Sequence, residues 1–168
     1  TLFSLSPQSM GQSRPREEPD DERLTHEFER TSPGRGAMMM SRYREAMPEV
    51  SSSELFCAYE TDRMFRMPTI RLAEARFSHI APTWQYLFDW PCAFNRRLKS
   101  CHVMEVPFVF GVTDKPAGQF FTGGGEEAVQ LSRQVRQAWS SFANGKAPMA
   151  EGWPEWPVYK PNHRAVLH

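Results

Sequence analysis

His102, followed three residues later by Glu105, is the histidine whose position in this 168-residue chain is best suited to chemistry. It lies in a loop just before an apolar run, and functional side chains often sit on loops held by a rigid scaffold. The unperturbed pKa of imidazole is close to neutral, so histidine can both accept and donate a proton. Taken alone, a loop histidine is still more often structural. The remaining histidines are expected to be solvated or structural: His26, His79, His163 and His168.

Three other kinds of site have weak support in the sequence. A metal site needs three or four ligands, and no second cluster accompanies the pair formed by His102 and Glu105. Cys101 is adjacent to His102, but neighbouring side chains of an extended loop point apart, so a paired cysteine nucleophile is not expected. Gly123–Gly125 lacks the Lys and Ser/Thr of a phosphate-binding loop and is interpreted as a turn. We therefore expect no metal and no cofactor.

The composition limits the partners of this chain. Twenty basic and twenty acidic residues cancel, which gives no electrostatic reason to expect nucleic acid or an anionic membrane. No stretch approaches the roughly 20 apolar residues of a membrane-spanning helix. Three cysteines cannot all pair with one another and are too few for a disulfide scaffold. The compartment stays open, with a slight preference for the cytoplasm.

The elements that must position His102 alternate between helix and extended chain. Residues 1–36 form a charged, poorly ordered segment with a short helix around 24–30, because mixed charge and proline offer little apolar area to bury. Further helices are predicted at about 37–46, 52–66 and 68–80. A serine cap with Glu54 begins the second of these, and Pro68 separates the last two.

The aromatic segment 83–90 is the strongest strand prediction, since aromatic residues favour extended positions. Residues 91–101 follow as a basic loop, and residues 111–125 are rich in turns. Residues 126–144 form the clearest amphipathic helix, which Gly145 is placed to end. The aromatic residues of the tail, 153–159, are expected to pack onto the body of the protein.

Several motifs together resemble the type-B carboxylesterases, the family of the para-nitrobenzyl esterases and cholinesterases. Residues 101–111 read CHVMEVPFVFG, which is similar to the segment that carries the catalytic histidine of that family. Further similarity lies in the helix pair that contains residues 61–75, in the strand 83–90, in the helix 131–144 and in the closing Trp-Pro-x-Tyr of residues 156–159. In order and spacing, the resemblance covers about residues 54–165.

The resemblance implies an α/β fold, namely the C-terminal part of an α/β-hydrolase, mostly helical with a few core strands and an incomplete sheet. Residues 1–36 would be the charged segment and residues 37–168 the hydrolase part. His102 would be the triad histidine, the general acid and base of ester hydrolysis. Glu105 would have a supporting hydrogen-bonding role. Phe108 and Phe110 would anchor the histidine loop in the core or line the acyl pocket.

The same resemblance implies that the chain is catalytically silent alone. No Gly-x-Ser-x-Gly nucleophile motif occurs in the 168 residues, and the triad acid has no matching motif either. The partners would be a small-molecule ester and the remainder of the hydrolase domain. Residues 95–100 depart from the small residues expected before the Cys-His pair, which puts the approach to the pocket in question. The alternative is a non-catalytic, cholinesterase-like domain for adhesion or scaffolding.

Overall fold

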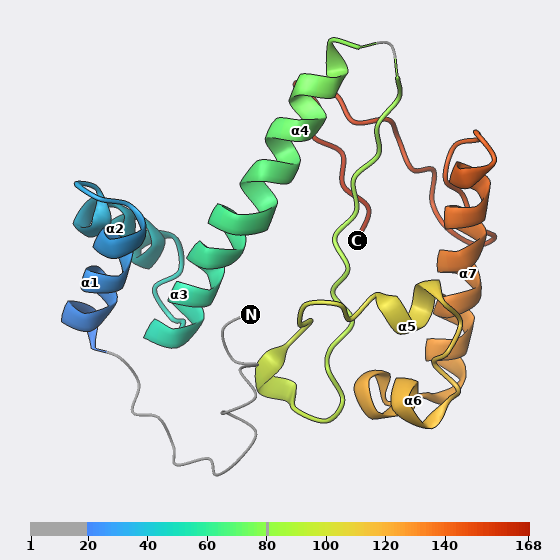
Figure 1. Cartoon of the computed structure of the whole chain (residues 1–168), viewed down its shortest axis with the longest axis horizontal. Helices are drawn as coiled ribbons and strands as arrows, with labels where there is room; N and C mark the ends of the chain where they lie inside the picture. Colours follow the sequence, from blue (N-terminus) through green and yellow to red (C-terminus); the bar gives the residue numbers. More distant parts are fainter. Residues whose placement is uncertain (1–19, 80) are drawn as a thin grey trace. The chain divides into compact units, whose positions relative to one another are not determined.

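The computed structural model describes residues 20–79 and 81–168 (Figure 1). The chain divides into two compact units, Thr1–Arg71 and Leu72–His168, and the boundary falls within one helix. The expected division after residue 36 stays a prediction, and the charged stretch 1–19 lies outside the described residues. None of the helices in the described part is long and apolar enough to cross a membrane.

The first unit is a cluster of helices around an aromatic core. Helix α1 (Asp21–Thr31) is the helix expected around residues 24–30, and it begins where the Asp20 carboxylate accepts the backbone N–H of Arg23 at 2.8 Å. Helices α2 (Gly36–Ala46) and α3 (Ser52–Thr61) pack against it. The rings of Phe28 and Tyr59 stack with centroids 4.1 Å apart at the centre of this core.

The predicted cap at the start of α3 is confirmed. The Ser51 hydroxyl accepts the backbone N–H of Glu54 at 3.2 Å, and the Glu54 carboxylate accepts the backbone N–H of Ser51 at 3.2 Å. This reciprocal capping box satisfies two amide groups that the first turn of a helix leaves without partners.

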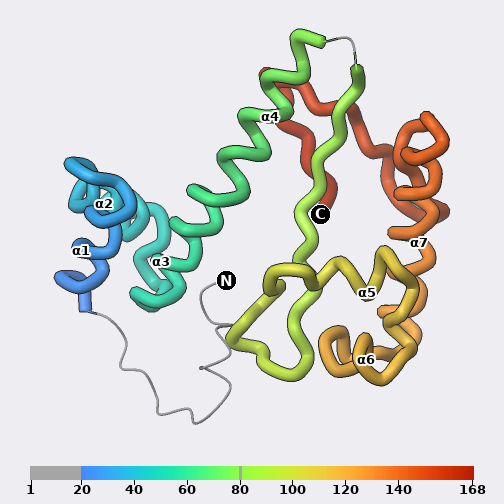
Figure 2. The backbone as a smooth tube through the Cα atoms, in the orientation of Figure 1, coloured from blue at the N-terminus to red at the C-terminus, as the bar shows by residue number. Residues whose placement is uncertain are grey.

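The predicted break at Pro68 is wrong, because the chain continues from α3 into α4 (Met67–Phe77) through a π-helical segment, Asp62–Arg66 (Figure 2). The N–H of Met67 bonds to the carbonyl of Asp62, five residues back, so the hydrogen-bond register has already shifted before Pro68. A π-turn thus accommodates a proline that an α-helical register would exclude. Helix α4 ends at Phe77, and residue 80, the expected end, is not described.

The predicted strand at 83–90 is not formed as a strand in the described residues of the second unit. The segment is extended, but its pairing is limited to one isolated parallel bridge between Tyr86 and Leu167. Leu87 donates its N–H to the Leu167 carbonyl at 2.8 Å, and Leu167 donates to Gln85 at 3.0 Å. The fold is therefore mostly helical, and in the described residues the few core strands predicted from the sequence are reduced to two isolated bridges, Tyr86 with Leu167 and Lys160 with His163.

Helix α7 (Gly125–Ala143) confirms the amphipathic helix predicted for residues 126–144. Gly145, at φ +74°, donates to the carbonyl of Phe142 at 2.9 Å, while Lys146 donates to Ser141 at 3.0 Å. This pair of bonds is a Schellman motif, which needs the left-handed conformation that glycine adopts without strain.

The turn-rich region 111–125 contains an element that the sequence analysis missed. Pro116–Thr122 forms helix α6, with its proline in the first turn, where a missing N–H costs nothing. The three glycines that follow all have positive φ angles, between 64° and 87°. This conformation agrees with the interpretation of Gly123–Gly125 as a turn.

Candidate active-site loop

The loop that leads to His102 is closed by hydrogen bonds to the extended segment before it. Cys92 donates its backbone N–H to the carbonyl of Lys99 at 2.8 Å, and the Ser100 hydroxyl donates to the carbonyl of Phe88 at 2.8 Å. Between them lies a single 3₁₀ turn, Arg96–Leu98. Both ends of the loop are therefore tied to the end of the aromatic segment, and Cys101 re-enters the core beside it.

A strained turn then separates inward-facing from outward-facing side chains. Cys101 and Met104 are buried in the core, whereas His102 is exposed. Val103 has a φ of +65°, a left-handed conformation that is unfavourable for a β-branched residue. Strain of this kind persists only where the surrounding structure enforces it, and it is concentrated at functional sites. Here it places the imidazole of His102 at the surface, between two anchored neighbours.

The thiol of Cys101 is not arranged as a nucleophile. Burial raises its pKa, and the neighbouring Cys92 raises it further, whereas a reactive cysteine needs a lowered pKa. The opposite exposures of Cys101 and His102 confirm that the two adjacent side chains point apart. No group of three or more histidine, cysteine or carboxylate side chains in the described parts of the chain could hold a metal ion.

Helix α5 (Val106–Val109) follows the histidine turn directly and packs against α7. The buried ring of Phe108 packs against Phe88 and Trp90, with centroids 5.0 and 5.2 Å away. The hydroxyl of Ser132, on α7, donates to the Phe108 carbonyl at 2.8 Å. Phe108 is thus packed in the core, whereas Phe110 is 73% exposed, and the roles expected for the two rings at the histidine loop and the acyl pocket stay predictions.

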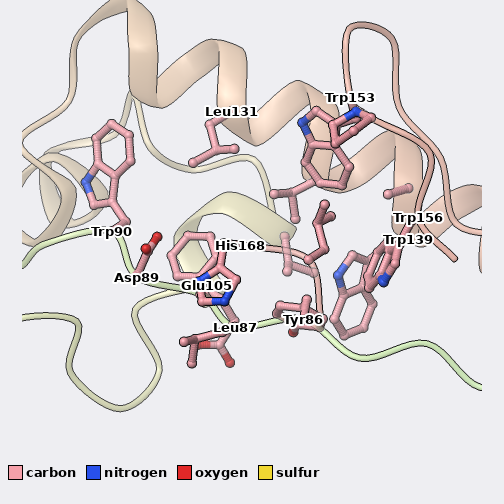
Figure 3. A pocket seen from close by; sticks show the side chains of 16 residues that line it. Tyr86, Leu87, Asp89, Trp90, Glu105, Leu131, Trp139, Trp153, Trp156 and His168 are labelled. Atoms are coloured by element: carbon pink, nitrogen blue, oxygen red, sulfur yellow. The ribbon is translucent and has the colours of Figure 1, made fainter. Parts of the chain in front are cut away.

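Glu105 lies at the edge of an aromatic cavity of about 210 Å³ (Figure 3). Figure 3 shows Trp90 at one end of this cavity and three tryptophans gathered at the other: Trp139, Trp153 and Trp156. Partial burial raises the pKa of the Tyr86 hydroxyl, and the charge of Glu105 raises it further. The carboxylate of Glu105 therefore acts electrostatically on the wall of the cavity.

The sequence analysis did not anticipate this cavity, although part of its lining carried a signal. Leu131, Val135 and Trp139 lie on the apolar face of α7, which the helical spacing had identified. The expected packing of the tail aromatics is confirmed by Trp156, whose indole N–H donates to the carbonyl of Gln85 at 2.9 Å. His168, expected to be solvated, is exposed and also lines the cavity. It arrives there through the long-range pairing of residues 86 and 167.

Comparison with known proteins identifies the family to which this chain belongs. The sequence pattern of the Carboxylesterase family matches residues 9–168, which is nearly the whole chain. The chain belongs to the carboxylesterase family, and its fold is a portion of an α/β-hydrolase. The family resemblance inferred from the motifs is therefore confirmed.

Individual relatives include bacterial and mammalian enzymes. The para-nitrobenzyl esterase of Bacillus subtilis (strain 168) is 36% identical over 107 residues, covering 64% of this chain and 22% of the relative. The cocaine esterase of Oryctolagus cuniculus is 36% identical over 108 residues, covering 61% of this chain and 20% of the relative. The acylcarnitine hydrolase of Rattus norvegicus is 30% identical over 129 residues, covering 73% of this chain and 22% of the relative. The chain thus spans about a fifth of the length of these relatives.

Proposed function

We propose that this chain is the part of a serine carboxylesterase that supplies the triad histidine, His102. The observation that carries the proposal is the exposure of His102 on a strained turn whose neighbours, Cys101 and Met104, are buried. A proton-transferring group must be held rigidly and must also remain accessible to its partner. The turn meets both requirements.

In the proposed reaction, His102 accepts the proton of a serine hydroxyl as the serine attacks the ester carbonyl. It then donates this proton to the departing alcohol, and a second cycle with water releases the acid. The serine and the backbone amides of the oxyanion hole would come from polypeptide outside these 168 residues, since the nucleophile motif does not occur among them. The isolated chain is therefore expected to be inactive.

Glu105 is proposed to support the histidine turn without taking part in proton transfer. It is half-buried and immediately precedes α5, whose Phe108 is buried in the core. A carboxylate in this position can hold the turn in one conformation through hydrogen bonding. The proposed substrate class is a small-molecule carboxylic ester, and this rests on the names of the relatives, which include a para-nitrobenzyl esterase and a cocaine esterase.

A chimera provides the test of the proposed function. The segment of the Bacillus subtilis para-nitrobenzyl esterase that aligns with this chain is replaced by the matching 107 residues of this chain. Hydrolysis of para-nitrophenyl acetate is then measured. We expect an active chimera whose His102→Ala variant loses activity by about 10³-fold or more, because removal of a triad member abolishes most of the catalysis.

The matched control is His163→Ala, which removes another exposed histidine of the second unit and is expected to leave activity unchanged. A chimera that stays fully active with alanine at position 102 would contradict the proposal. Hydrolysis by the isolated 168-residue chain that disappears in its own His102→Ala variant would contradict the expectation of an inactive chain.

A further inference from the structure

Two thiols meet at the base of the histidine loop. The side chains of Cys92 and Cys101 are 0% and 5% exposed and belong to one core cluster with Met104. Burial raises the pKa of the Cys101 thiol and the neighbouring Cys92 raises it further, which agrees with two thiols lying close together in this cluster. Both are free thiols in this structure, as is Cys57, which is exposed on α3. The contact between the two sulfur groups is therefore made by the fold.

Backbone hydrogen bonds hold the two chain segments that carry these thiols close together. The N–H of Cys92 bonds to the carbonyl of Lys99 at 2.8 Å, two residues before Cys101, so the chain segments that carry the two thiols lie side by side. Lys99 has a φ of +50°, a left-handed conformation that turns the chain back at this point. Disulfides need close Cα atoms and facing Cβ vectors, and paired segments of this kind bring such atoms together.

We propose that Cys92 and Cys101 form an intramolecular disulfide that closes the loop 92–101. The oxidant is a low-molecular-weight disulfide such as oxidised glutathione. Although burial raises the pKa of Cys101 and makes this step slow, its thiolate, which belongs to the less buried of the two residues, attacks one glutathione sulfur and releases one reduced glutathione. The thiolate of Cys92 then attacks the Cys101 sulfur and releases the second. Two protein thiols are oxidised, one glutathione disulfide is reduced, and two thiol protons pass to the departing glutathione thiolates.

The bond would fasten the residue that directly precedes His102 to the end of the aromatic segment. The loop would then be closed by a covalent bond in addition to its two hydrogen bonds, from Cys92 to Lys99 and from Ser100 to Phe88. This modification does not depend on the proposed esterase activity. The test of the disulfide therefore measures the oxidation of the two thiols, and its result does not depend on whether the proposed esterase function is correct.

The first experiment maps the pairing in the full 168-residue chain. The chain is equilibrated with oxidised glutathione, its remaining thiols are alkylated, and it is digested with trypsin. Trypsin cleaves between the two cysteines, at Arg96, Arg97 and Lys99, so the disulfide is seen as two peptides that stay joined until they are reduced. We expect this joined pair, while Cys57 carries glutathione or the alkylating group. Recovery of Cys92 and Cys101 as alkylated thiols would overturn the proposal.

The second experiment separates a pair held by the fold from a pair that is only close in sequence. The redox equilibrium with glutathione is measured for Cys57→Ala in native buffer and in urea. We expect the native equilibrium to favour the disulfide by about tenfold or more over the unfolded chain, because the fold has already paired the thiols. Equal values in both solvents would overturn the proposal. With Cys92→Ala, glutathione is expected to stay bound to Cys101, because the resolving thiol is gone.

Discussion

The two units differ in how completely they cover their own apolar side chains. In the first, the rings of Phe28, Tyr43 and Tyr59 contact one another in a core closed by α1, α2 and α3. Its large exposed apolar residues are mostly flexible methionines, Met38, Met64 and Met67, together with Phe65. The second unit exposes larger and stiffer groups on its helices and loops: Leu72, Phe77, Leu87, Phe110, Phe120, Trp139 and Phe142.

The first unit therefore buries most of its large apolar rings in its own core, whereas the second unit leaves several of them exposed. Exposed apolar area of this kind marks an interaction surface or an aggregation hazard. The second unit leaves such apolar faces uncovered in this structure. The candidate active-site loop lies in that unit, which agrees with a site that is completed by other polypeptide in the proposed function.

The largest expected effect comes from truncating one buried phenylalanine in each unit. Phe28→Ala and Phe108→Ala each remove a fully buried ring, which costs about 3–5 kcal/mol of unfolding free energy. All five tryptophans belong to the second unit, so tryptophan fluorescence reports on that unit alone.

Urea unfolding followed by fluorescence and by far-UV circular dichroism separates the two responses. Phe28→Ala should lower the stability seen by circular dichroism and leave the fluorescence transition in place, whereas Phe108→Ala should shift the fluorescence transition. If both variants shift both transitions equally, the two units unfold together and the comparison fails.

A smaller effect is expected from the cap that starts α3. Ser51→Ala removes the hydroxyl that accepts the Glu54 amide and should cost the first unit about 1 kcal/mol. The matched control is Ser41→Ala, an exposed serine within α2, where alanine is at least as good a helix former. Thermal unfolding monitored by circular dichroism measures both. A cap variant as stable as this control would show that packing alone sets the start of the helix.

The smallest expected effect concerns acid stability of the first unit. The Glu29 carboxylate accepts backbone N–H groups of Gly34 and Gly36, and these bonds lower its pKa in the folded state. Its contribution to stability is therefore fully present above the ordinary glutamate pKa and is lost as the pH falls through the lowered value.

Glu29→Gln should remove this part of the acid destabilisation, so the variant's stability should depend less steeply on pH in the acid range. Glu45→Gln, whose carboxylate faces Arg42 at 3.7 Å on the surface of α2, is the control and should keep the steepness of the natural chain. Chemical denaturation at a series of acid pH values measures the slope. Identical slopes for Glu29→Gln and the natural chain would exclude a role for the two backbone bonds.

Local signals predicted the helices well and the sheet poorly. The cap at Ser51, the apolar face of α7 and the glycine at 145 each act within a few residues, and all three are confirmed. The strand at 83–90 failed because a strand requires a partner, and its only bridge in the described residues joins Tyr86 to Leu167, far along the chain. The helix break predicted at Pro68 was wrong for a different reason. A π-turn can accommodate a proline, and no rule of residue spacing anticipates such a turn.

The sequence by itself determined the family, through the motif around His102. It also determined the helices around this motif, because helix capping and apolar periodicity depend on residues that are close together in the sequence. Only the tertiary structure decided that Val103 would take a left-handed turn, that the Cys92 and Cys101 thiols would meet, and that the end of the chain would line a cavity with Glu105. These features depend on burial against residues distant in sequence, and burial is a property of the packed chain.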